Sequence, residues 1–161
     1  MRCKMHATPS IEPSQRQHEH GEGEKLRYVI AVLAFAGIVV SSLALAGRYD
    51  PPVRPIEIVH SHWNSSYVNQ SPYSNVHGVP VAVLGIVCYA LLLVLALLRH
   101  RVLTVYLACI GVAYAFHLTH IQAQVLRVWC VYHVSSLILI VLIAFLAFGE
   151  LLSEPPQVTQ R

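Results

Sequence analysis

Charged side chains are scarce in this chain of 161 residues. Aspartate, glutamate, lysine and arginine together make up 12% of it, against 55% apolar residues. A soluble domain of ordinary composition is about one quarter charged, so the sequence excludes that class and indicates an integral membrane protein. The formal net charge is only +3 and no basic stripe stands out, which argues against nucleic acid as a partner.

Paired cysteines are also missing. The four cysteines, Cys3, Cys88, Cys109 and Cys130, form no C-x-x-C motif, and none of them lies between residues 47 and 78. This spacing excludes a disulfide framework.

An apolar segment close to the N-terminus is absent too. Residues 1–25 are polar, so the sequence predicts a disordered cytoplasmic tail rather than a signal peptide.

Four long apolar segments dominate the rest of the chain. They cover residues of about 27–46, 79–98, 102–121 and 128–148. Each has roughly the 20 residues that cross a bilayer as a helix. We therefore predict an all-α membrane protein, a four-transmembrane-helix bundle in residues 26–150. A long first extracytoplasmic loop occupies 47–78, and a C-terminal tail occupies 151–161.

A short basic turn sets the expected orientation. Arg99 and Arg101 lie between the second and third apolar segments. Short loops rich in arginine and lysine stay in the cytoplasm. With four spans, both termini are then cytoplasmic and the long first loop faces outward. We expect a multi-pass protein of the plasma (inner) membrane.

The stretch VLRVWCVYHVSS, residues 125–136, holds the main candidates for chemistry. Cys130 and His133 are three residues apart at the predicted start of the last helix, so we expect them on one helical face. The positive end of a helix favours anionic groups such as a thiolate. Cys130 is therefore a reactive thiol or, as the alternative, a small side chain that packs in an apolar bundle.

Histidines gather in the outer half of the predicted bundle. His117 and His120 share a helical face near the end of the third segment, and His133 is expected at a similar depth. Imidazole groups bind zinc, copper, iron or nickel, so these three histidines are a candidate metal site. The alternative is a hydrogen-bond network between helices, which the lack of a nearby carboxylate favours.

Two motifs resemble the vitamin K epoxide reductase family. Residues 68–92, VNQSPYSNVHGVPVAVLGIVCYALL, are similar to the family's serine-centred loop motif followed by Gly-x-Pro and a further glycine. Residues 116–136, FHLTHIQAQVLRVWCVYHVSS, are similar to the end of its third helix and the redox motif that begins its fourth. The resemblance covers roughly residues 26–150.

The resemblance implies a four-helix bundle around a quinone. In the family, a C-x-x-C pair on the fourth helix passes electrons to the quinone, and a cysteine pair in the first outer loop exchanges with thiols of extracytoplasmic partner proteins. By position, the resemblance implies catalytic roles for Cys130, His133 and Ser65. It also implies quinone-binding roles for Ser71 and Asn69.

The chain departs from the family at the redox cysteines. Cys130 matches the first cysteine of the C-x-x-C pair, but His133 stands at the second position. Ser65 stands at the loop cysteine, six residues before Ser71. Thiol exchange needs an attacking and a resolving thiol, so the relay is incomplete. Two functions remain open: a quinone-coupled membrane oxidoreductase with a degenerate active site, or a non-catalytic relative that binds a quinone, a metal or a partner protein.

Overall fold

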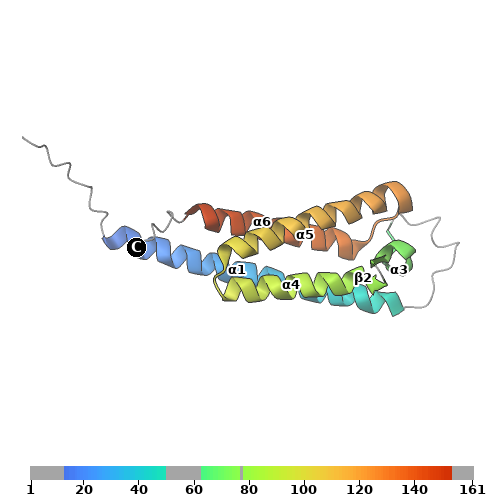
Figure 1. Ribbon diagram of the computed structural model, residues 1–161, viewed down its shortest axis with the longest axis horizontal. Coiled ribbons are helices and arrows are strands. Elements are labelled where there is room, and N and C mark those ends of the chain that lie inside the picture. The colour runs from blue at the N-terminus through green and yellow to red at the C-terminus, as the bar shows by residue number, and fades with distance from the viewer. Residues whose placement is uncertain (1–12, 50–62, 77, 154–161) are drawn as a thin grey trace, which may run out of the picture.

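The computed structural model describes residues 13–49, 63–76 and 78–153. Expectations for residues 1–12 and 154–161 of the two tails and 50–62 of the first loop lie outside these described residues. Within them, four long helices run along one axis, and a short helix and a small hairpin gather at one end (Figure 1). The predicted helical architecture is confirmed in its main feature, since the described part of the chain is mostly helical.

The first long helix, α1, begins earlier than expected. It spans Pro13–Ala46 and is followed by a 3-10 turn, Gly47–Tyr49. The sequence predicted a disordered tail to residue 25 and a helix from about residue 27, whereas residues 13–25 are helical. The polar composition was wrongly taken as a sign of disorder. Glu, Gln, Lys and Arg are good helix formers, and a helix extends cooperatively from a stable span. The start of α1 projects beyond the other helices (Figure 1).

The other three long helices lie close to their predicted ranges. Helix α4 spans Val81–Leu97, α5 spans Arg101–Ile121 and α6 spans Val131–Ser153. Three stretches, starting in α1, α5 and α6, are long and apolar enough to cross a membrane. Helix α4 is apolar as well but has only 17 residues. These helices are those of an integral membrane protein, as predicted.

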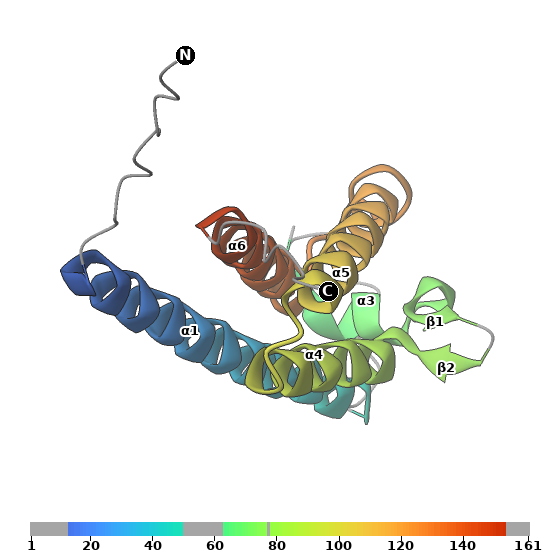
Figure 2. The same cartoon turned by 60° about the vertical axis from the view of Figure 1, so that its left-hand side comes forward.

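The four long helices pack in a ring. Helix α1 contacts α4 and α6, and α5 contacts the same two helices (Figure 2). Small side chains in the buried core let the helices approach closely: Ala34, Ala96, Ala108 and Ala147. Large apolar side chains on the outer faces, such as Phe35 on α1, are exposed and suit contact with lipid.

The described part of the first loop closes one end of the bundle. It contains helix α3 (Ser65–Gln70), a 3-10 turn (Pro72–Ser74) and a hairpin of strands β1 (Asn75–Val76) and β2 (Val79–Pro80). Asn64 caps α3, because its side-chain oxygen accepts a hydrogen bond from the Tyr67 N–H at 3.0 Å. Gly78 permits the hairpin turn, since its φ of 85° lies in the left-handed region that favours glycine.

Helix α6 begins at Val131, three residues later than predicted, so Cys130 precedes it. The reason is a contact with the loop. Trp129 forms an isolated parallel β-bridge with Trp63, and its carbonyl oxygen accepts a hydrogen bond from the Asn64 N–H at 3.1 Å. This pairing uses the backbone in an extended form, and the helix starts only after it.

Candidate functional site

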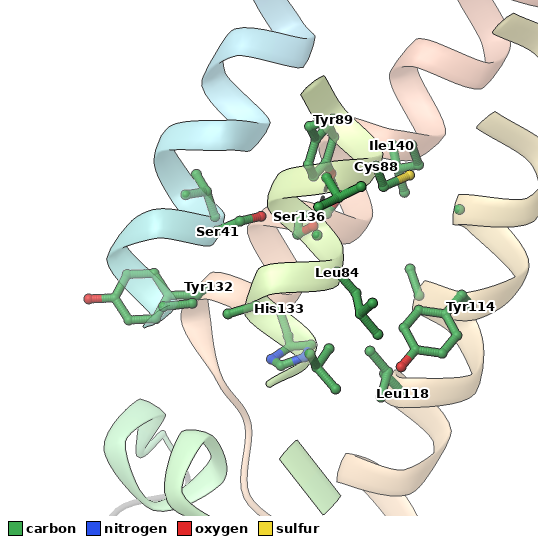
Figure 3. A pocket seen from close by; sticks show the side chains of 18 of the residues that line it. Ser41, Leu84, Cys88, Tyr89, Tyr114, Leu118, Tyr132, His133, Ser136 and Ile140 are labelled. Atoms are coloured by element: carbon green, nitrogen blue, oxygen red, sulfur yellow. Dashed lines mark hydrogen bonds between the residues drawn. The ribbon is translucent and has the colours of Figure 1, made fainter. Parts of the chain in front are cut away.

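A cavity lies between the four long helices at the loop end of the bundle. Its volume is about 370 Å³, which is within the usual range for small-molecule sites in proteins. The walls are mostly apolar and come from all four long helices, with Asn69 and Ser74 of the loop at one end. Figure 3 shows the pocket from close by, with Leu84 near its centre. Such a space fits a hydrophobic ring that carries few polar groups.

Most polar groups around the cavity already have partners within the protein. The Tyr89 hydroxyl donates to the carbonyl oxygen of Ser136 at 2.8 Å and lies 2.9 Å from its hydroxyl. Asn69 donates from Nδ2 to the Ala44 carbonyl oxygen at 2.9 Å, which ties α3 to the end of α1. Arg48 donates to the Asn69 carbonyl oxygen at 3.3 Å. These groups hold the walls and the loop together.

Two polar atoms at the cavity are buried without a partner. Within the described part of the chain, the Tyr114 hydroxyl and His133 Nδ1 are the buried side-chain atoms that form no hydrogen bond. Tyr114 comes from α5 and His133 from the first turn of α6, and both line the cavity (Figure 3). An unpaired buried polar atom costs about 1–3 kcal/mol of stability. Two residues that line a mostly apolar cavity thus carry hydrogen-bonding atoms without a partner in the described part of the chain.

Cys130 lies outside the cavity, under α3. Its side chain is fully buried and packs against Val68. Its thiol donates a long hydrogen bond to Asn69 Oδ1 at 3.9 Å, and its backbone N–H donates to Gln122 Oε1 at 3.4 Å. The expectation that Cys130 and His133 face the same way is therefore wrong, because Cys130 precedes α6 whereas His133 lies on its first turn.

Ser65 lies beside the start of α6. Its hydroxyl accepts a hydrogen bond at 3.2 Å from the backbone N–H of Val131, the residue that follows Cys130. An exposed N–H at a helix start normally needs such a partner. The structure thus brings Ser65 and Cys130, two of the predicted catalytic residues, to the same helix end from distant parts of the sequence.

The two predicted quinone-binding residues have different positions. Asn69 lines the cavity. Ser71 is buried in the loop, where its hydroxyl donates to the Val68 carbonyl oxygen at 2.8 Å, and it does not line the cavity. Ser71 thus holds the end of α3 in place, and only Asn69 could touch a bound molecule.

The three histidines do not form a metal site. His117 and His120 are exposed on α5, whereas His133 lines the cavity. Among the residues that the structure describes, no three metal-ligating side chains come together. The metal hypothesis is therefore wrong for these histidines. Their i,i+3 spacing correctly gives His117 and His120 a common face, but the packing of α5 turns that face away from His133.

The other cysteines do not complete a thiol pair with Cys130. Cys88 lines the cavity from α4, and Cys109 is exposed on α5. Both are free thiols, as is Cys130. Neither Cys88 nor Cys109 is therefore bonded to Cys130.

The sequence profile of the Vitamin K epoxide reductase family matches residues 28–148, well over half of the chain. The chain belongs to this family. Comparison with individual curated proteins gives no match. The matched region contains the cavity, α3, Cys130 and His133. The resemblance of the two sequence motifs to a family of quinone-linked membrane thiol oxidoreductases is thereby confirmed.

Sequence reasoning missed two residues of the site. Nothing in the sequence distinguishes Tyr114, whose hydroxyl is buried at the cavity, from Tyr106, which is exposed on the same helix. Gln122 follows α5 in a single π-helical turn and is buried where it holds the Cys130 backbone. A lone glutamine at a predicted turn gives a weak signal, although π-helical turns are frequent at functional sites.

Proposed function

We propose that this protein binds the ring of a membrane quinone in the cavity and does not run the dithiol relay of the vitamin K epoxide reductase family. The main support is where the two redox positions lie. His133 lines the cavity, whereas Cys130 is buried outside it, under α3. A quinone ring is flat and apolar with polar atoms at its edge, and the cavity of about 370 Å³ has walls of that character.

The chemistry of the side chains supports the second half of this proposal. A thiol–disulfide relay needs a thiolate to attack and a second thiol to resolve the mixed disulfide. Neither the hydroxyl of Ser65 nor the imidazole of His133 forms a disulfide. Cys130 therefore has no thiol partner at the family's redox positions, and its own sulfur is buried.

A single-thiol oxidoreductase is the second candidate function. Its support is Asn69, which accepts the hydrogen bond of the Cys130 thiol and also lines the cavity. In that function, a thiol-bearing extracytoplasmic protein partner would supply the second thiol. The enzyme would then keep the family's coupling of thiol oxidation to a quinone with one cysteine of its own.

We infer the membrane orientation from the charge of one turn. Helix α4 has 17 residues, the short limit for a span, and we propose it as the fourth span beside α1, α5 and α6. Arg99 lies in the turn between α4 and α5 and Arg101 is the first residue of α5, which favours a cytoplasmic position for that end. Both termini are then cytoplasmic, and the cavity and α3 lie at the outer face of the plasma (inner) membrane.

Extraction of lipids from the purified protein tests the quinone site. We expect about one quinone per protein molecule in the wild type. The variant Cys130→Ala should retain the same amount, because Cys130 lies outside the cavity. A protein that purifies without quinone and also fails to bind an added naphthoquinone would contradict the proposal.

Disulfide formation in membrane vesicles that lack the usual oxidase tests the missing relay. We expect no more disulfide formation with this protein than with empty vesicles. Activity that disappears in Cys130→Ala would establish the single-thiol function instead. Activity that survives this substitution would contradict both functions.

A further inference from the structure

The two unpaired polar atoms at the cavity come from facing helices. Tyr114 lies on α5 and His133 on α6, and Figure 3 shows their polar groups in the same part of the pocket, with Leu84 between them in this view. The Tyr114 hydroxyl and His133 Nδ1 are buried and form no hydrogen bond within the described part of the chain. Both atoms can donate a hydrogen bond, since a neutral imidazole carries its proton on either nitrogen.

Two neighbouring polar groups are already hydrogen-bonded within the protein. The Tyr89 hydroxyl is held by Ser136, and Asn69 Nδ2 is held by the Ala44 carbonyl oxygen. A molecule that enters the cavity therefore meets mostly apolar walls, the Ser41 hydroxyl, and the side chains of Tyr114 and His133, which carry the two buried atoms without a partner in the described part of the chain. A buried donor that stays unpaired destabilises a protein, so a ligand with two acceptor atoms gains by binding here.

We propose that the Tyr114 hydroxyl and His133 Nδ1 are the hydrogen-bonding anchors of the cavity and hold the carbonyl oxygens of the bound quinone. This inference rests on the proposed function and names the residues that recognise the ligand. A quinone suits the site because its only polar atoms are acceptors on a flat hydrophobic ring. His133 then acts by hydrogen bonding, where the family has a thiol.

Binding of two matched molecules to the purified protein tests the proposal. Menadione is a naphthoquinone, and 2-methylnaphthalene has the same methylated ring system without the carbonyl oxygens. We expect Tyr114→Phe and His133→Phe each to weaken menadione binding about 3- to 10-fold, the effect of one hydrogen bond. Binding of 2-methylnaphthalene should stay within about twofold of the wild type, because no hydrogen bond is lost.

Two further variants serve as controls. Tyr106→Phe removes the same hydroxyl from an exposed tyrosine of α5 and should change neither affinity. His133→Asn places an amide donor near the position of Nδ1 and should restore menadione binding relative to His133→Phe. A loss in His133→Asn as large as in His133→Phe would show that no hydrogen bond at this position holds the ligand, and would overturn the role of His133.

The stability of the ligand-free protein separates a binding role from a structural one. Because the Tyr114 hydroxyl is unpaired, Tyr114→Phe should raise the melting temperature by a few degrees while it weakens menadione binding. A lowered melting temperature would show that the hydroxyl has a structural partner, and would overturn the inference. Equal menadione binding in the wild type and both phenylalanine variants would refute the hydrogen-bonding roles of Tyr114 and His133. It would not refute the binding of a quinone in the cavity. If the wild-type protein bound neither menadione nor 2-methylnaphthalene, both the proposed quinone binding and this inference would be refuted.

Discussion

Helices α1 and α4 pack so closely at Gly37 that one added methyl group should destabilise the protein. A Cβ atom built on Gly37 of α1 would lie 2.4 Å from two ring carbons of Tyr89 on α4, far inside van der Waals contact. The ring is not free to turn away, because its hydroxyl is bound to Ser136 on α6. Gly37→Ala therefore forces the helices apart or displaces Tyr89, which also lines the cavity.

Three contributions determine how much Gly37→Ala changes the free energy of unfolding. Overpacking of a well-packed core costs about 1–3 kcal/mol. Loss of the Tyr89 hydrogen bond adds about 0.5–1.5 kcal/mol. Alanine gains about 0.5–1 kcal/mol over glycine inside a helix. The net destabilisation is about 2 kcal/mol, which for a chain of this size lowers the melting temperature by about 4–8 °C.

Thermal unfolding in detergent, followed by circular dichroism, measures this change. Gly149→Ala is the matched control, since it makes the same substitution in α6 where a built Cβ meets nothing within 4 Å. It should leave the stability unchanged or raise it slightly. The double variant with Tyr89→Ala should lose less than the sum of the single variants, because the clash is gone. Gly37→Ala with the stability of Gly149→Ala would refute this crossing of α1 and α4.

Two further predictions concern orientation and the redox motif. A cysteine introduced at Tyr73, which is exposed in the loop, should react with an impermeant maleimide only from outside; reaction only from the cytoplasmic side would reverse the orientation. His133→Cys should form a disulfide with Cys130 if the Cys130 side chain turns out from under α3. The hydrogen bond from the Val134 N–H to the Cys130 carbonyl oxygen, 3.1 Å, keeps positions 130 and 133 within one helical turn, and disulfides need Cα atoms about 4.4–6.8 Å apart. A maleimide gel shift before and after reduction measures it, and unpaired thiols in the folded variant would mean that Cys130 cannot leave its place under α3.

Much of the helical architecture could be predicted, because apolar segment length reflects the thickness of the bilayer. Helices α4 and α5 lie within two residues of their predicted ranges for this reason. The start of α1 was missed because residues 13–25 are polar, whereas the helix extends through them in spite of Gly21 and Gly23. Hydropathy predicts which part of a helix spans the membrane but does not predict the residue at which the helix begins.

The site could be predicted only in part, because its geometry depends on contacts between distant segments. Asn64 holds Trp129, which precedes α6, and Ser65 holds Val131, its first residue. Cys130 thus lies before the helix and His133 on it. Spacing alone treats both as helical. In the same way, the i,i+3 spacing predicts that His117 and His120 share a helical face. It does not predict whether that face points toward the cavity or away from it. The role of Tyr114 depends on the rotation of α5 about its own axis, which no local pattern determines.

The two departures from the family's redox pattern have a common physical consequence at Cys130. A cysteine at position 65 would lie beside Cys130, where a thiol that exchanges with it must be, but Ser65 instead accepts a hydrogen bond from the start of α6. That bond keeps the loop attached over the cavity without a thiol. At the other position, His133 keeps a polar side chain in the cavity but cannot form a disulfide. Both positions that carry a thiol partner of Cys130 in the family therefore lack a thiol here, while Ser65 still ties the loop to the start of α6. Electron transfer through thiols needs a thiol pair, whereas binding of a quinone ring needs only the cavity, and this difference is the basis of our proposal of binding without dithiol exchange.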